Sequence, residues 1–217
     1  MFDVRVNEGG GNTIALLAAS NFASERTLAY TLRTVNGDGF TNMTDVFIPI
    51  GDPAYRHVDK VIVIISESCV SAGETFSLAM AQLPQTTFLG RNTAAVFSDT
   101  LKRSLPNGWL VGLSNEVVAA PDGTVYEKVG IPPDIVPVAE LLPLSERDAG
   151  VDSWLELAIA TAKESAAPTS APTSSAANNK SYYCAPLWVA SIIMWTFFNK
   201  KFAFLYLKTS PEIILLT

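Results

Sequence analysis

The chain has 217 residues, of which 48% are hydrophobic, so a domain of ordinary size can bury a substantial core. Its formal net charge is −6, which argues against the basic face that a nucleic-acid-binding protein needs. Two cysteines and a single histidine are too few for a Cys/His metal site, and two distant cysteines do not make a disulfide framework.

The first two thirds of the chain alternate between strand and helix patterns. A short strand is predicted over residues 2–6, followed by a glycine loop at residues 9–11. Asn12 or Thr13 is predicted to cap a helix over residues 13–23. Further elements are strands over 27–35, 44–50, 61–66, 86–90, 109–113 and 115–120, and a helix over 72–82.

The segment "VIVIIS" (61–66) is the strongest single indication of fold class. Its five consecutive β-branched apolar residues suit a strand that is covered on both faces, as in a parallel sheet with helices on each side. Together with the strand–helix alternation around it, this segment predicts an α/β fold.

The last third of the chain changes character twice. The prolines of "GIPPDIVPV" (130–138) predict extended chain, and an apolar stripe that includes Trp154 predicts a helix over 145–165. The segment 165–181 is rich in alanine, serine, proline and threonine, which predicts a disordered linker. The remainder, 182–217, is a hydrophobic tail.

The tail leaves three interpretations open. Its apolar core, 185–198, is about 14 residues long, whereas a transmembrane helix needs about 20. The tail is a short membrane anchor over 185–207 with interfacial aromatic residues, a lipid-anchor signal that is removed, or non-native sequence from a wrong gene boundary.

Ser71 is the candidate nucleophile. It lies between the apolar strand and the helix that follows, where a hydroxyl is exposed at a sharp turn and the helix N-terminus favours negative charge. The alternative is purely structural: Ser71 caps the helix, and Glu74 three residues later completes a capping box.

Four motifs in order resemble those of the S41 serine peptidases, the family of tail-specific (C-terminal processing) and tricorn core proteases. "DVRVNEGG" (3–10) resembles the Asp-x-Arg-x-Asn-x-Gly-Gly signature, and "SAGE" (71–74) resembles the nucleophile segment. "LGRNT" (89–93) is similar to the Gly-x-x-Thr turn, and "PDGTVYEKVGIPPDIV" (121–136) is similar to the closing stretch.

The resemblance implies a ClpP/crotonase-like α/β core, peptide-bond hydrolysis, protein or peptide substrates and no cofactor. It implies that Ser71 is the nucleophile and that the Ala72 N–H and the N–H of Gly9 or Gly10 form the oxyanion hole. Relatives act largely outside the cytoplasm, so an extracytoplasmic or membrane-associated location is favoured.

The family uses two kinds of base. In the Ser-Lys version the lysine follows the Gly-x-x-Thr turn, where this chain has Val96, and Lys102 lies in a different segment. In the Ser-His-Glu version, which tricorn represents, the glutamate precedes a Gly-x-x-Pro-Asp motif, and Glu127 occupies that position. The histidine of that version comes before the Asp-x-Arg-x-Asn signature, whereas His57 lies in a loop ahead of the apolar strand.

We therefore expect an N-terminally truncated S41 peptidase domain, with Ser71 and Glu127 present and the histidine missing upstream. Glu8, beside the glycines, would oppose an oxyanion unless its side chain points away. A catalytically dead peptide-binding scaffold and a crotonase-type acyl-CoA enzyme are the alternatives. The expected parts are a peptidase domain (1–140), a C-terminal helix (141–164), a linker (165–181) and a hydrophobic tail (182–217).

Overall fold

The computed structural model describes residues 1–57 and 59–166. A parallel sheet lies at its centre, with the strand order β1 (Phe2–Asp3), β5 (Val61–Ile65) and β6 (Thr86–Gly90). Val63 lies opposite both Phe2 and Phe88, so β5 is the middle strand. All five residues of β5 are buried, as the run of β-branched residues predicted.

The two faces of β5 belong to two different cores. Val61, Val63 and Ile65 pack in the larger core with helices α1 (Asn12–Ser20) and α2 (Ala72–Met80). Ile62 and Ile64 pack on the opposite face with Leu89, Trp154 and Ala158. Because alternate residues of a strand point to opposite faces, this division puts helices on both sides of the sheet.

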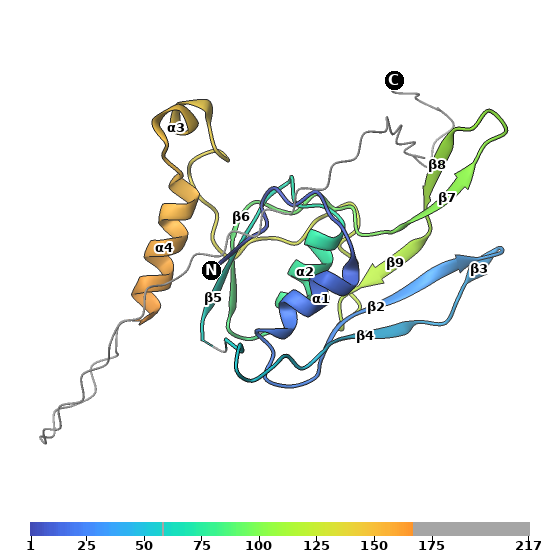
Figure 1. Ribbon diagram of the computed structural model, residues 1–217, viewed down its shortest axis with the longest axis horizontal. Coiled ribbons are helices and arrows are strands. Elements are labelled where there is room, and N and C mark those ends of the chain that lie inside the picture. The colour runs from blue at the N-terminus through green and yellow to red at the C-terminus, as the bar shows by residue number, and fades with distance from the viewer. Residues whose placement is uncertain (58, 167–217) are drawn as a thin grey trace, which may run out of the picture.

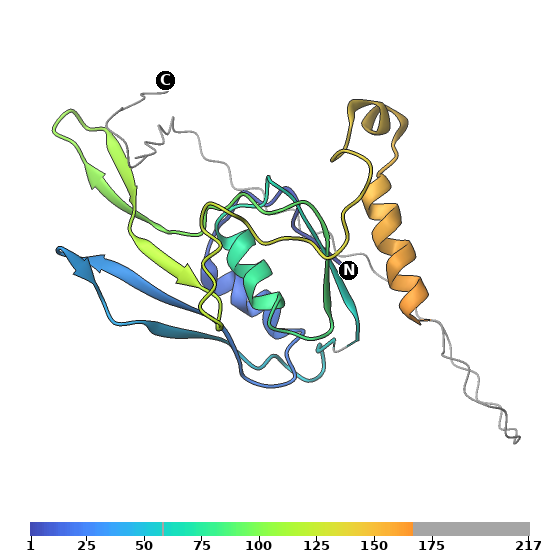
Figure 2. The ribbon, with the colours of Figure 1, turned by 180° about the vertical axis from the view of Figure 1, so that it is seen from behind.

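A second, antiparallel sheet covers the other side of α1 and α2 (Figures 1 and 2). In it β2 (Thr27–Asn36) pairs with β4 (Thr44–Ile48) on one edge, with β9 (Glu116–Ala119) on the other and with the short β3 (Gly39–Phe40) at its end. A separate hairpin, β7 (Thr100–Ser104) with β8 (Leu110–Ser114), extends from the body on the same side as the end of β2 (Figure 1). The layers are therefore helix, parallel sheet, helix pair and antiparallel sheet.

Helix α4 (Ser153–Ala166) is the outer layer over β5 and β6 (Figure 1). Trp154 anchors this helix: the residue is 1% exposed, and its indole N–H donates to the carbonyl of Ala139 over 3.1 Å. The short helix α3 (Leu144–Ala149) precedes it and ends at Gly150, where φ is +66°. The single helix expected over 145–165 is thus two helices, because Gly150 takes a left-handed conformation between them.

The sequence-based expectations of an α/β fold and of most strands are confirmed. The predicted cap of α1 is wrong, because Gly11 is the N-cap and Asn12 is the first helical residue. Strand β7 was not predicted, since "TLKRS" is mostly polar and its residues after Thr100 are exposed. The expected tail (182–217) and nearly all of the expected linker lie outside the described residues. Among the described helices, none is long and apolar enough to cross a bilayer.

Candidate active site

Ser71 lies at the turn between β5 and α2, immediately before the first residue of that helix. Its backbone has φ 53° and ψ −116°, a combination that residues with a side chain rarely adopt. Such a conformation costs about 1–3 kcal/mol and persists only where the surroundings enforce it. The Ser71 N–H donates to the Glu74 side chain over 3.2 Å, which is the Glu74 half of the capping box that the sequence suggested, so the turn starts the helix and is also strained.

The glycine loop that follows β1 packs directly on Ser71. A Cβ atom on Gly9 would lie 2.9 Å from the Cβ and 3.3 Å from the Oγ of Ser71, so the approach requires glycine. Asn7 joins the two segments. Its side-chain Oδ1 accepts from the Gly9 N–H over 2.9 Å, and its carbonyl accepts from the Val70 N–H over 2.9 Å.

Glu74 also holds the turn at Ser71 in place, although its position in the sequence suggested only a helix cap. Its carboxylate is fully buried and accepts three backbone N–H bonds, from Ser71 at 3.2 Å, Ala95 at 2.7 Å and Val96 at 2.8 Å. Burial raises the pKa of Glu74 above its ordinary value, although these bonds and one from the Thr93 side chain act in the opposite direction. Glu74 therefore holds the segment after β6 against the turn that carries Ser71.

Glu127 lies on the segment that borders the same turn. Its Oε2 accepts from the N–H groups of Phe97 at 2.9 Å and Ser98 at 3.1 Å. The preceding residue, Val96, accepts the Ser71 N–H through its carbonyl at 3.1 Å. Glu127 and Ser71 thus contact consecutive residues of one strip of chain. Within the described residues, Oε1 of Glu127 has no hydrogen-bond partner.

The other candidate bases do not approach Ser71. Lys102 is exposed on β7, in the hairpin that extends from the body (Figure 1). The His57 N–H donates to the carbonyl of Asn21, just after the C-terminus of α1, and its ring packs edge-on against Phe22. Asn12, at the other end of this nine-residue helix, accepts from Thr75 in the first half of α2. His57 therefore lies about 13 Å along the axis of α1 from the end of that helix that contacts α2 near Ser71.

Cys69 and Glu8 also lie near the turn that carries Ser71. Burial, reinforced by the negative charge of Glu74, raises the pKa of the Cys69 thiol to about 12, so Cys69 is an inert thiol at neutral pH. Glu8 is exposed beside the glycine loop. No cluster of His, Cys, Asp and Glu in the described part of the chain could hold a metal ion.

Arg5 ties the base of the glycine loop to α4. Its side chain is 6% exposed and binds Asp152 through two nitrogens, at 2.7 and 2.5 Å. It also binds Asp3 at 2.8 Å. Asp152 in turn accepts the Leu155 N–H in the first turn of α4. The Arg5–Asp152 ion pair was not predicted from the sequence, because nothing in the spacing of the two residues indicates that they are in contact.

Removing the Asp152 charge is expected to destabilise the protein in a pH-dependent way. Burial opposes ionisation of Asp152, but its bonds to Arg5 and to backbone N–H groups outweigh burial and hold its pKa below the ordinary value. The contribution to stability is therefore present above about pH 4 and is lost as the pH falls through the lowered pKa. Asp152→Asn should cost about 2 kcal/mol at pH 6, since it leaves buried Arg5 with only Asp3.

Urea denaturation at pH 6 and at pH 3 measures this effect. The deficit of Asp152→Asn relative to wild type should shrink at the lower pH. Asp148→Asn, which removes an exposed carboxylate on α3, is the matched control and should change stability little at either pH. A deficit that is equal at both pH values would show that the Arg5–Asp152 pair does not titrate as described.

The strain at Ser71 makes a separate prediction. Glycine adopts φ 53° and ψ −116° without a steric penalty, whereas alanine keeps the penalty of a Cβ atom. Ser71→Gly should therefore be more stable than Ser71→Ala by about 1 kcal/mol, although glycine also loses more chain entropy on folding. Thermal denaturation of the two variants side by side tests this order, and the reverse order would mean that the turn is not strained.

A family-level comparison decides what kind of protein carries this arrangement. The sequence model of peptidase family S41 matches residues 1–137, which include the glycine loop, the Ser71 turn and Glu127. The chain belongs to peptidase family S41. The predicted resemblance is thereby confirmed, and α3 and α4 lie beyond the matched region of this S41 chain.

Solved structures agree with the assignment of the S41 chain. A protein of Parabacteroides merdae that is assigned as a peptidase has 30% identity, a TM-score of 0.65, and covers 74% of this chain and 50% of its own length. Mature CPAF in complex with lactacystin has 14% identity, a TM-score of 0.58, and coverages of 75% and 42%. The photosystem II D1 C-terminal processing protease has 19% identity, a TM-score of 0.51, and coverages of 65% and 35%.

Because the last two structures have low sequence identity to this chain, they show only that the fold is shared. The S41 chain spans half the length of the Parabacteroides protein and about a third of the D1 processing protease. A comparison with curated proteins gave no match.

Proposed function

We propose that this chain carries the nucleophile of a serine-type endopeptidase of the tail-specific kind, with Ser71 as the attacking residue. The observation that carries the proposal is the strained turn at Ser71, against which Gly9 packs at a distance that no other residue allows. A serine that acted only as a helix cap would not need a backbone at φ 53°, since caps ordinarily have extended backbones. Strain of this kind is concentrated at functional sites.

The oxyanion hole of the proposed enzyme uses the N–H groups of Ala72 and Gly10. Ala72 is the first residue of α2, so no carbonyl within the helix can accept its N–H. Gly9 is the weaker of the two glycine candidates, because its N–H already donates to Asn7. The Gly10 N–H donates no hydrogen bond within the described residues. Two backbone donors and the N-terminal end of α2 would stabilise the negative charge that develops on a scissile carbonyl.

Glu127 has the role of orienting the base in this proposal. One of its oxygens is held by Phe97 and Ser98, which leaves the other free to accept from an imidazole N–H. The base itself is a histidine from outside this sequence, because the chain has one histidine and that residue, His57, lies at the far end of α1. We therefore expect the isolated chain not to cleave peptides.

A peptide-binding scaffold without catalytic activity is the second candidate. Val96, which stands where the Ser-Lys version has its base, has an apolar side chain, and His57 is remote. Either function takes proteins or peptides as ligands and uses no cofactor. We also propose an extracytoplasmic or membrane-associated location, with residues 185–207 as the membrane contact. The proposed parts of the chain end at residues 140, 164 and 181.

Imidazole added to the solution can substitute for the absent histidine and so test the function. The isolated chain is incubated with p-nitrophenyl acetate, with and without imidazole, and acetylation of Ser71 is followed by mass spectrometry of peptides. A base in reach of a nucleophile typically contributes 10²–10⁴-fold, so we expect imidazole to accelerate Ser71 acetylation by about 100-fold beyond its effect on Ser68. Ser68 lies in the same turn region and serves as an internal control.

The outcomes separate the two functions. Selective acetylation of Ser71 that Ser71→Ala abolishes supports the peptidase. Binding of an unstructured protein without selective acetylation favours the scaffold. Cleavage of an unstructured protein by the chain alone, lost in Ser71→Ala, would overturn the statement that the base is missing.

A further inference from the structure

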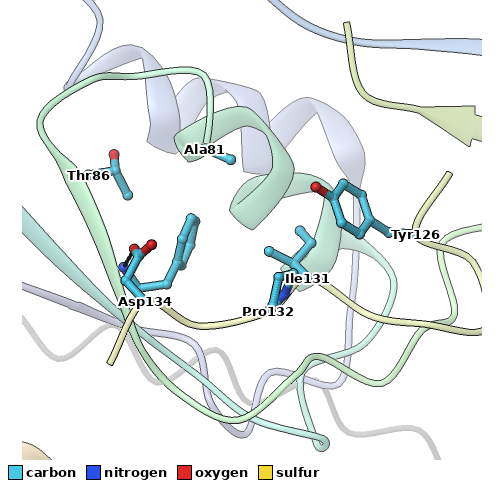
Figure 3. Close-up of a pocket in the computed structure, with 7 residues that line it drawn as sticks. Ala81, Thr86, Tyr126, Ile131, Pro132 and Asp134 are labelled. Carbon is cyan, nitrogen blue, oxygen red and sulfur yellow. Dashed lines mark hydrogen bonds between the residues drawn. The ribbon is translucent and has the colours of Figure 1, made fainter. Parts of the chain in front are cut away.

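A pocket of about 260 Å³ lies alongside α2 and reaches the C-terminal end of this helix (Figure 3). Ala81, which lines it, follows the last residue of this nine-residue helix, so this end of the pocket is about 13 Å along the helix axis from Ser71. The rest of its lining comes from β6 and from the segment on both sides of Glu127: Thr86, Phe88, Tyr126, Ile131, Pro132 and Asp134. The proposed peptidase chemistry uses none of these side chains.

The charge around this pocket is negative. Asp134 contributes a carboxylate, one oxygen of which accepts the Phe88 N–H at 2.7 Å, and Asp134 as a whole is exposed. The C-terminal end of α2 adds the negative pole of the helix, and this last turn contains no basic residue. None of the seven lining residues is basic. The carbonyls of the last turn are already hydrogen-bonded, so the helix acts through its dipole.

Polar and aromatic groups line the same pocket as the carboxylate. Figure 3 shows Thr86 on the same side as Asp134 and Tyr126 on the other side, with its hydroxyl turned towards α2. The Thr86 Oγ1 is buried and has no hydrogen-bond partner within the described residues. Rotation about χ1 would present this oxygen to a donor in the pocket. Aromatic rings, hydroxyls and a carboxylate that line one pocket are groups that favour an organic cation.

We propose that this pocket binds a primary ammonium or guanidinium group. Its volume is below the range of pockets for drug-sized ligands, so it fits one basic side chain or one chain terminus. A divalent metal ion fits poorly, because the described lining offers only one carboxylate. The proposal does not depend on whether Ser71 is catalytic. It concerns a site on the same segment that carries Glu127.

Titrations followed by chemical shifts of backbone amides test the site on the full chain. The probes are Nα-acetyl-lysine amide, Nα-acetyl-arginine amide and glycinamide, which separate basic side chains from a free N-terminus. Nα-acetyl-norleucine amide, which lacks the charge, is the reference. We expect saturable shifts at Thr86, Tyr126 and Asp134 with at least one cationic probe, at a dissociation constant of about 1 mM, and none with norleucine.

Two variants and a control complete the test. Asp134→Asn keeps an acceptor for the Phe88 N–H and removes the charge, so it should weaken binding about tenfold. Tyr126→Phe removes only the hydroxyl, and it replaces Asp134→Asn as the test variant if Asp134→Asn does not fold. Asp122→Asn makes the same charge change in an exposed turn outside the pocket and should leave the affinity unchanged.

The proposal is overturned by equal binding of the norleucine and lysine probes, which would indicate an apolar pocket. It is also overturned by equal weakening in Asp134→Asn and Asp122→Asn, which would indicate non-specific attraction. Absence of saturable shifts with all three cationic probes would likewise reject it.

Discussion

Replacing Gly90 by alanine is expected to destabilise the protein by about 4 kcal/mol. Gly90 is the last residue of β6 and has φ +135°, which residues with a side chain avoid. A Cβ atom there would lie 1.9 Å from the carbonyl oxygen of Ile65 and 3.0 Å from the ring of Trp154. Since the Ile65 carbonyl also accepts the Arg91 N–H, neither side can move without breaking the end of the sheet.

Urea denaturation measures this loss, and Gly39→Ala provides the control. Gly39 lies in β3, has no atom within 4 Å of its Cβ position and does not have a positive φ, so alanine should change stability by less than about 1 kcal/mol there. If Gly90→Ala were as stable as Gly39→Ala, the close packing of β6 between β5 and Trp154 would have to be rejected.

Replacing Glu74 by alanine is the second large expected change, again about 4 kcal/mol. The substitution removes the acceptor of three backbone N–H groups, on Ser71, Ala95 and Val96, and leaves a cavity in the core. Because Glu74 holds Ser71 through its backbone, the imidazole-dependent acetylation of Ser71 should fall as well. Glu74 does not touch the reacting atoms, so we regard it as a positioning residue.

Glu74→Gln distinguishes positioning from simple loss of volume. Glutamine fills the same space but replaces one acceptor oxygen with a donor, which would face an N–H group. Acetylation of folded Glu74→Gln, measured well below its denaturation midpoint, should still be slower than that of wild type. Glu67→Gln, an exposed carboxylate in the same turn region, is the control and should react normally. Unchanged Ser71 reactivity in Glu74→Gln would limit Glu74 to a structural role.

The sequence predicted elements whose signals are local. The β-branched run at 61–66 identified the central strand, and the turn before Ala72 identified the start of α2, because periodicity and caps depend on nearby residues. Strand β7 and the break at Gly150 were not found. The first is polar and is paired only with β8, and the second depends on one backbone angle.

The candidate site divides in the same way. Ser71, Gly9 and Glu127 could be named because each belongs to a motif that a family resemblance identifies. That one strip of chain, residues 96–98, links Ser71 with Glu127 could not be read from the sequence, since it requires the path of the chain after β6. The same holds for Arg5 and Asp152, which are far apart in sequence and meet only across the sheet edge.

The Arg5–Asp152 contact also limits how this protein can be shortened. A fragment that ends at residue 137, where the family match ends, would lack Asp152 and α4. It would strip the cover from Ile62, Ile64 and Leu89 and leave the Arg5 guanidinium with Asp3 as its only carboxylate. An expression boundary chosen from the match alone would thus give an aggregation-prone product, whereas one placed after residue 166 retains all the packing described for residues 1–57 and 59–166.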